Sequence, residues 1–120
     1  MRSLCVFADP EIPWFPKELR ANTRSDRRWT GSVRKKYKQD CYFLAKGKDL
    51  DCDSITIIFY PPDKRKRDLD NCLSSIKYGI DGVCEAVGID DYQFVKKLIV
   101  RGDPVSGGKI IIKKGIDRLE

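Results

Sequence analysis

The chain contains no histidine among its 120 residues. This absence excludes serine–histidine and cysteine–histidine catalysis, and it excludes every metal site with a histidine ligand. An enzyme with this sequence must therefore use carboxylates, lysine, arginine, tyrosine or a bound metal. The sequence also lacks an apolar run of the roughly 20 residues that span a bilayer, and it begins without the apolar segment of a signal peptide. We therefore expect a cytoplasmic protein with no membrane partner.

Cysteine is present in an odd number and in no metal-binding pattern. No Cys-x-x-Cys occurs, which argues against a zinc site, and the odd count argues against a disulfide framework. We expect reduced thiols, several of them filling the core. The five residues are Cys5, Cys41, Cys52, Cys72 and Cys84.

Positive charge is in excess, with 24 lysines and arginines against 18 aspartates and glutamates, for a net charge of +6. A chain of this length forms one small domain, and its charge predicts a polyanionic partner, either nucleic acid or anionic lipid. A membrane surface is the poorer choice, because no basic amphipathic helix with exposed bulky apolar residues occurs.

The most informative stretch is 64–71, Lys-Arg-Lys-Arg-Asp-Leu-Asp-Asn. Its carboxylates, Asp68 and Asp70, are two residues apart, and a further acidic pair follows at Asp90 and Asp91. Mg²⁺ and Mn²⁺ bind through a few carboxylates plus water and phosphate, and the neighbouring cations suit a polyanion. The pattern predicts a metal-dependent nuclease site. The alternative is a solvated basic loop in which an aspartate caps a helix.

Hydrophobic patterning predicts an α/β (α+β) fold in the order β-α-β-α-β-β. We expect one domain over residues 1–120, a mixed sheet of about four strands with two packed helices. The last two strands should form an antiparallel hairpin, and the prolines at 10, 13 and 16 should interrupt regular structure. The expected strands are Ser3–Ala8, Ser54–Tyr60, Phe94–Arg101 and Lys109–Lys114. One expected helix begins near Thr30 or Ser32, and the other runs from about Asp70 to Val87.

The second helix has the clearest apolar face, and Gly88 is placed to end it. A polar stripe of Asp70, Ser74, Lys77 and Asp81 flanks that face, so we expect Asp70 and Lys77 to point the same way. In the first helix, basic residues 34–38 oppose the helix dipole. They are available to contact phosphate or to keep the surface soluble.

These residues resemble the RusA-type Holliday junction resolvases, and the resemblance spans most of the chain. The combination of Arg-Asp-x-Asp-Asn with a later Asp-Asp pair is specific, whereas the Trp/Pro segment is weak alone. The matching segments are Pro62–Asn71, Lys77, Asp81-Gly82, Gly88-Ile89-Asp90-Asp91 and Pro13-Trp14-Phe15-Pro16.

The resemblance implies a homodimeric endonuclease that resolves four-way DNA junctions with Mg²⁺ or Mn²⁺. It implies that Asp68, Asp70 and Asp91 hold the metal and are catalytic, and that Arg67 and Lys77 act on the phosphate. One departure is that the family's lysine lies four residues after the second aspartate, where this chain has Ser74. The alternative for Lys77 is an ion pair with Asp81, one helical turn away.

Two functions remain open on the sequence alone. The first is the structure-selective nuclease, and the second is a non-catalytic DNA- or RNA-binding module with the same basic face. The aspartates could come together within one subunit or across a dimer, and the sequence leaves this open. Apolar groups for a dimer interface are offered by Trp14, Phe15 and the strand at 110–112, although the core could take them instead. In either function the expected DNA-binding residues are Lys64, Arg65, Lys66 and Arg67.

Overall fold

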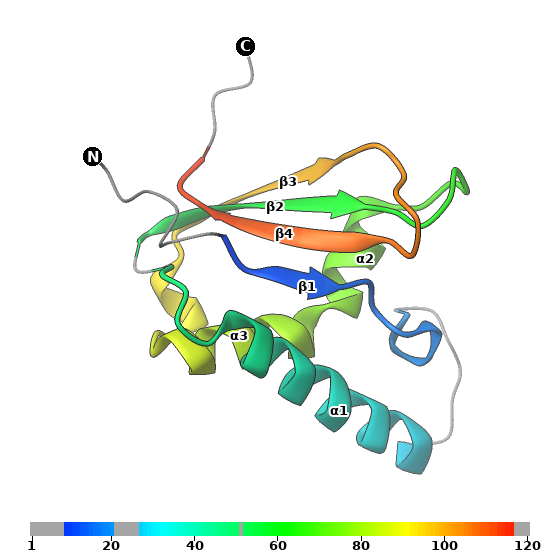
Figure 1. Ribbon diagram of the computed structural model, residues 1–120, viewed down its shortest axis with the longest axis horizontal. Helices are drawn as coiled ribbons and strands as arrows, with labels where there is room; N and C mark the ends of the chain where they lie inside the picture. The colour runs from blue at the N-terminus through cyan, green and yellow to red at the C-terminus, as the bar shows by residue number, and fades with distance from the viewer. Residues whose placement is uncertain (1–8, 21–26, 51, 117–120) are drawn as a thin grey trace.

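Four strands form one mixed sheet in the computed structural model, which describes residues 9–20, 27–50 and 52–116 (Figure 1). β2 pairs with β3 in parallel and with β4 antiparallel, and β1 pairs antiparallel with the other side of β4. The predicted α+β class with a four-stranded mixed sheet is confirmed. The sheet order is β1-β4-β2-β3, with β1 at Glu11–Pro13, β2 at Ser54–Tyr60, β3 at Lys96–Arg101 and β4 at Lys109–Lys114.

The predicted hairpin between the last two strands is wrong, because β2 lies between β3 and β4. The chain after β3 crosses the end of β2: the Gly102 N–H donates to the Phe59 carbonyl at 2.8 Å, and the Val105 N–H donates to the Pro61 carbonyl at 2.8 Å. Strands that are consecutive in sequence usually neighbour each other in a sheet. The local sequence pattern identifies a strand but not the strand with which it pairs. The position of β2 between β3 and β4 could therefore not be predicted from the sequence.

The first strand lies later than predicted. The predicted strand Ser3–Ala8 falls outside the described residues, and β1 instead occupies Glu11–Pro13 within the proline-rich segment. The expectation that these prolines exclude regular structure is therefore wrong for this segment. Proline is tolerated at a sheet edge because the missing N–H need not serve a second strand, and β1 is an edge strand with Ile12 opposite Ile110 of β4.

Three α-helices accompany the sheet in the described part of the chain: α1 at Arg27–Ala45, α2 at Leu69–Ser75 and α3 at Lys77–Val87. α1 begins a few residues before the predicted start at Thr30 or Ser32. A 3-10 turn, η2, lies at Lys17–Leu19, and another, η3, lies at Asp91–Gln93. As predicted, Gly88 ends α3 in the left-handed conformation, with a φ of 77°.

The predicted single helix from about Asp70 to Val87 is broken at Ile76, whose ψ of 10° is not helical. Immediately before the break, the Ser75 hydroxyl donates to the Asn71 carbonyl at 2.7 Å, a bond that bends helices. Figure 1 shows α2 and α3 running in different directions. The prediction that Asp70 and Lys77 share one stripe is therefore wrong, because they belong to different helices.

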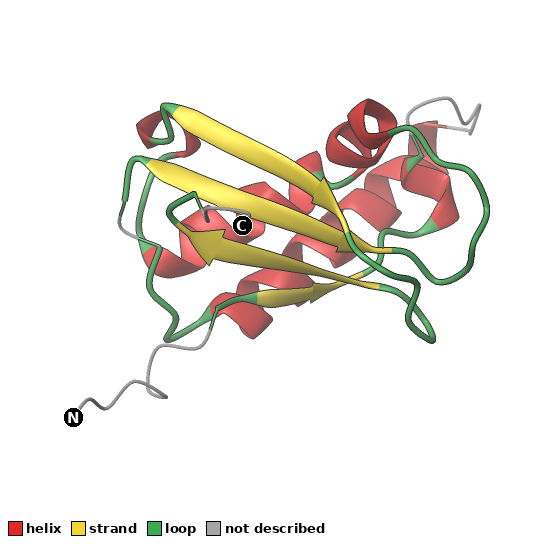
Figure 2. Cartoon of the chain, turned by 90° about the horizontal axis from the view of Figure 1, so that it is seen from above, coloured by secondary structure: helices red, strands yellow, loops and turns green. Residues whose placement is uncertain are grey.

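All described helices lie on one face of the sheet, as Figure 2 shows with the strands in front of them. The opposite face carries Ile58 of β2, which lies beside Val100 of β3 and Ile111 of β4. No described helix covers these half-buried residues. Between the sheet and the helices lies the core, which includes Ile12, Ile57, Phe59, Tyr37, Cys41, Ile76, Val83, Ile110 and Ile112.

Two glycines allow α1 and α3 to cross closely. A Cβ at Gly79 would lie 2.7 Å from a ring carbon of Tyr37, and a Cβ at Gly82 would overlap the backbone carbonyl oxygen of Lys38. The crossing is therefore restricted to residues without a side chain. Because α3 follows α2 directly, this crossing also sets where the end of α2 lies.

The buried cysteines fill the core, as predicted. Cys41, Cys72 and Cys84 are almost fully buried, and the four described cysteines are all free thiols. None of the described helices has the length and apolar character needed to cross a membrane.

Candidate functional site

The basic loop after β2 is organised by one carboxylate, Asp63. Its side chain accepts a hydrogen bond from the Arg65 backbone N–H at 2.9 Å and forms an ion pair with the Arg67 guanidinium at 2.9 Å. These bonds, with that to Arg67 the largest contribution, lower the pKa of Asp63, so it stays ionised at neutral pH. Asp63 therefore folds the loop back on itself and fixes Arg67.

Arg67 is held more tightly than the other cations of the run. Its side chain is 21% exposed, against 71% for Arg65. The guanidinium also donates to the Arg65 carbonyl at 3.2 Å and lies 5.5 Å from the centre of the Trp14 ring. Arg67 thus joins the basic loop to the N-terminal aromatic segment, while Lys64, Arg65 and Lys66 remain exposed.

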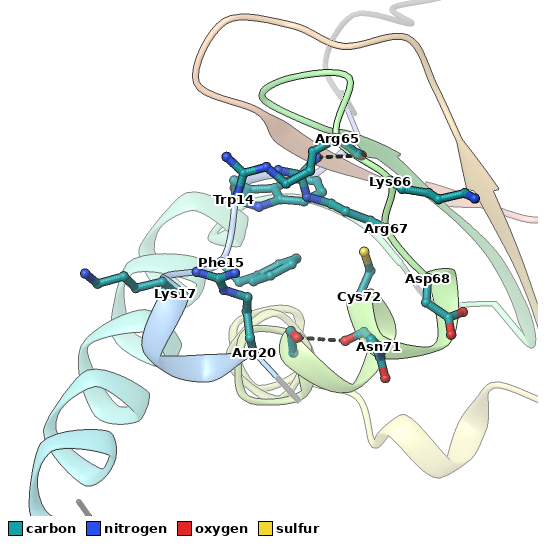
Figure 3. A pocket seen from close by; sticks show the side chains of 11 residues that line it. Trp14, Phe15, Lys17, Arg20, Arg65, Lys66, Arg67, Asp68, Asn71 and Cys72 are labelled. Carbon is teal, nitrogen blue, oxygen red and sulfur yellow. Dashed lines mark hydrogen bonds between the residues drawn. The ribbon is translucent and has the colours of Figure 1, made fainter. Parts of the chain in front are cut away.

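A cavity of about 350 Å³ lies between the segment 14–20 and the segment 65–75. Figure 3 shows Trp14, Arg65 and Arg67 gathered on one side and Cys72 and Asn71 of α2 on another. Five of the lining residues are cations, Lys17, Arg20, Arg65, Lys66 and Arg67, and the others are Trp14, Phe15, Asp68, Asn71, Cys72 and Ser75. One carboxylate against five cations gives the cavity an excess of positive charge that suits an anion, and its two aromatic rings add a surface for flat groups.

Trp14, Phe15, Lys17 and Arg20 are the part of this site that the sequence did not predict. Trp14 stacks on Phe15 with ring centres 4.6 Å apart and meets Phe59 edge-on at 6.1 Å. The available signal was a pair of aromatic residues flanked by prolines and followed by two cations. No periodicity links that segment to α2, so only the fold reveals that they face each other.

Asp68 and Asp70 stand at the start of α2, beside the cavity. The Asp68 carboxylate accepts a hydrogen bond from the Asp70 N–H at 3.4 Å and caps the helix. Asp68 is therefore the helix cap that the alternative prediction required, and it also lines the cavity. The Asp70 carboxylate is exposed and has no bonding partner among the residues that the structure describes.

Asp91 lies at the other end of α3 from these two aspartates. Its Oδ1 atom has no access to solvent and lies 3.0 Å from the Lys97 ammonium nitrogen. Eleven residues of α3 span about 16 Å, and the segment after η3 bonds to Asp53 at the beginning of β2. Asp70 follows the opposite end of β2, so the length of the sheet and of α3 separates Asp91 from Asp70.

The three predicted metal ligands therefore do not meet within one chain. Across residues 9–20, 27–50 and 52–116, no group of three acidic or cysteine side chains is placed to hold a metal ion. The pair Asp68 and Asp70 remains, and Mg²⁺ is commonly held by one or two carboxylates completed by phosphate oxygens and water. This donor pair fits Mg²⁺ or Mn²⁺ only together with a phosphate.

Lys77 is exposed at the start of α3, and among the described residues it forms no ion pair with Asp81. The basic residues of α1 are partly engaged within the chain. Arg34 lies 5.0 Å from the Tyr78 ring, and Lys36 and Lys38 form exposed ion pairs with Asp40 and Glu85. Exposed pairs of this kind are weak, so these lysines can exchange their partner for a phosphate.

Cys72 lines the cavity, and its surroundings do not activate the thiol as a nucleophile. Burial raises the pKa of its thiol above the ordinary value, which outweighs the opposing effect of Arg67. The thiol is therefore protonated at neutral pH, and the thiolate is the reactive form. The chemistry available at this site comes from the carboxylates and cations alone.

Comparison with known proteins leaves the family of the chain open. A scan against models of protein families finds no match. The chain is similar to an uncharacterized protein of Xylella fastidiosa (strain Temecula1), with 28% identity over 109 residues that cover 84% of this chain and 71% of the relative. That similarity extends over most of the domain and carries no activity with it, so the function has to be inferred from the site.

Proposed function

We propose that this chain is a metal-dependent endodeoxyribonuclease that cuts four-way DNA junctions. The observation that carries the proposal is the position of Asp68 and Asp70 beside a cavity with five cations. Carboxylates next to a phosphate-binding surface weaken binding, unless a metal or a reaction requires them. A cytoplasmic location fits this function, because thiols stay reduced there and the four described cysteines are free.

Each residue has a stated part in this proposal. Asp70 and Asp68 hold Mg²⁺ or Mn²⁺ together with phosphate oxygens and water. A divalent cation supplies positive charge that neutralises the phosphate during an in-line displacement. Water attacks the phosphorus atom, one backbone P–O bond breaks, and the leaving oxygen takes a proton. Arg67, held in place by Asp63, and the exposed Lys77 add positive charge where the transition state is most negative.

A second function is supported by a different observation. Asp91 is separated from Asp68 and Asp70 in one chain, and Asp68 already has a structural task as a helix cap. Both facts favour a DNA- or RNA-binding module that does not cut. The two functions share the basic surface and differ in whether Asp70 is needed for chemistry.

We infer that the protein acts as a homodimer. A four-way junction has approximate two-fold symmetry, and two paired cuts require two sites related by the same symmetry. The sheet face with Ile58, Val100 and Ile111, which no described helix covers, offers an apolar surface to a second copy. Of the groups expected at an interface, Phe15, Ile110 and Ile112 lie in the core instead. Only from a second copy could Asp91 approach Asp70 without a change of fold.

Sedimentation equilibrium at micromolar concentration tests the dimer. The proposal predicts twice the chain mass of 13.8 kDa. Ile111→Asp places a charge on the sheet face that no described helix covers and should give monomers, whereas Gln39→Asp at an exposed position of α1 should not. A monomer that persists with junction DNA bound would contradict paired cutting by this chain.

A cleavage assay tests the activity. A labelled four-way junction and a linear duplex of the same sequence are incubated with the protein in Mg²⁺, in Mn²⁺ and in EDTA. We expect cuts in the junction alone, in either metal, and in opposing strands. Binding of the junction without any cut in either metal would support the binding module and refute the nuclease.

A further inference from the structure

We propose that the cavity between segments 14–20 and 65–75 binds one unpaired nucleotide of a branched DNA. The phosphate lies on the cations, and the base lies against the layer formed by Trp14 and Arg67. This inference deepens the proposed function, because it names the part of the DNA that the site takes. It rests on the DNA binding of that function but not on the cutting.

The size of the cavity favours a single nucleotide. About 350 Å³ is near the lower end of the range for small-molecule pockets. A base inside a duplex cannot enter such a pocket, because it remains in the stack until it is unpaired. At the point where the strands of a branched DNA meet, the stacking of base pairs is interrupted, so a pair there opens at lower cost than a pair inside a duplex and supplies the unpaired nucleotide.

The charges favour a phosphate at the rim rather than at the floor. Arg20, Arg65 and Lys66 are exposed cations that line the cavity. The floor is built from Cys72 and Ser75, which are 4% and 2% exposed. A phosphate placed on this floor would lose the water that it keeps among the exposed cations of the rim, and the effect of Arg67 there is smaller than that of burial, whereas an uncharged base fits on the floor. A nucleotide would therefore enter with its base first.

The aromatic wall favours a base over a plain anion. Trp14 is half-buried against Phe15 and Phe59, and the Arg67 guanidinium lies over its ring. Unpaired bases stack on aromatic rings and on arginine guanidinium planes. Backbone phosphates of a duplex would need only exposed cations such as Lys64, so they do not explain an aromatic cavity. Asn71, exposed at the mouth, offers an amide to the edge of the base.

Binding measured in EDTA tests this inference separately from cleavage. Three labelled duplexes are compared by fluorescence anisotropy: one with a single-nucleotide bulge, one with an abasic residue in the bulge, and one fully paired. We expect the bulge with its base to bind about tenfold more tightly than the abasic bulge, a factor within the range of base stacking on aromatic side chains.

Trp14→Ala should abolish that tenfold difference, and Trp14→Phe should reduce it while retaining the packing against Phe15. The matched control is Phe43→Ala, which removes a 59% exposed ring of α1 outside the cavity and should keep the difference. Arg20→Ala should weaken binding of both bulged duplexes equally. Circular dichroism of each variant establishes that it is folded, and if Trp14→Ala is not, Trp14→Phe decides the result.

Equal affinity for the base-containing and abasic bulges would overturn the inference, as would an unchanged difference in a folded Trp14 variant. A free deoxynucleoside monophosphate is added as a competitor. If it displaces the bulged duplex at the same concentration as the bulge itself, the cavity is a site for free nucleotides and the assignment to DNA is overturned. A chain that cuts junctions without this discrimination refutes only the nucleotide site, and one that discriminates without cutting refutes only the nuclease.

Discussion

The crossing of α1 and α3 predicts opposite effects for one substitution at two glycines. In the middle of a helix, glycine to alanine gains about 0.5–1 kcal/mol of stability, because glycine loses more freedom on folding. At Gly82 the added Cβ would meet the carbonyl oxygen of Lys38, a backbone atom that cannot turn aside. Overpacking of this kind costs about 1–3 kcal/mol. We expect Gly82→Ala to lower the free energy of unfolding by about 1–2 kcal/mol.

Gly31 of α1 is the matched control. It is exposed, and a Cβ there would meet no described atom within 4 Å beyond the backbone of its own helix. Gly31→Ala should therefore raise the free energy of unfolding by up to about 1 kcal/mol. Urea unfolding followed by circular dichroism measures both variants. A Gly82→Ala variant as stable as Gly31→Ala would refute the close helix crossing. It would also refute the position of α2, which leads directly into the start of α3.

Three further predictions concern the basic loop and the buried thiols. Replacing Lys64 and Lys66 by alanine should reduce by about 2 the steepness with which the logarithm of the junction-binding constant falls with the logarithm of salt concentration. An unchanged slope would show that these two lysines do not contact phosphate. Arg67→Ala should cost about 1 kcal/mol of stability through its lost contact with the Trp14 ring, whereas Lys66→Ala should cost less than about 0.5; equal losses in urea would contradict the ordered role of Arg67. Burial raises the pKa of Cys41 and Cys84 to about 12. As the pH rises, both thiols ionise in the unfolded chain before they ionise in the folded chain. Their contribution to the free energy of unfolding is therefore fully present at neutral pH and is lost as the pH rises toward 12. The loss is up to about 1.4 kcal/mol per pH unit for each thiol. Urea titrations at about pH 8 to 10.5 should show this decline, and a Cys41→Ala/Cys84→Ala variant that declines equally would contradict it.

The strands β2 and β4 could be predicted to their end residues, because both are dense runs of β-branched residues, the first ended by prolines and the second flanked by Gly108 and Gly115. Their partners could not, since a strand pattern is the same whichever neighbour it bonds. The break at Ile76 was also hidden. The apolar residues keep their helical spacing through the break. The hydrogen bond from the Ser75 hydroxyl to the Asn71 carbonyl does not change that spacing, so the sequence pattern does not reveal it.

The site shows the same limit. The run at 64–67 and the aspartates after it were visible as a local pattern, and the capping role of Asp68 was one of its two predicted meanings. The aromatic half of the cavity comes from residues 14–20, which only the fold places across the cavity from α2. The distance between Asp70 and Asp91 likewise depends on the path of α3. The presence of several carboxylates in the sequence therefore did not imply that they lie at one site in a single chain.

Single-turnover cleavage of a four-way junction by Asp70→Asn tests the central claim most directly. Asp103→Asn is the control, since Asp103 is an exposed carboxylate in the loop after β3, at the same end of the sheet. We predict that Asp70→Asn cuts at least about a hundredfold more slowly in Mg²⁺ and binds the junction in EDTA as well as the wild type or more tightly. Asp103→Asn should cut at the wild-type rate. Wild-type cleavage by Asp70→Asn would contradict the account.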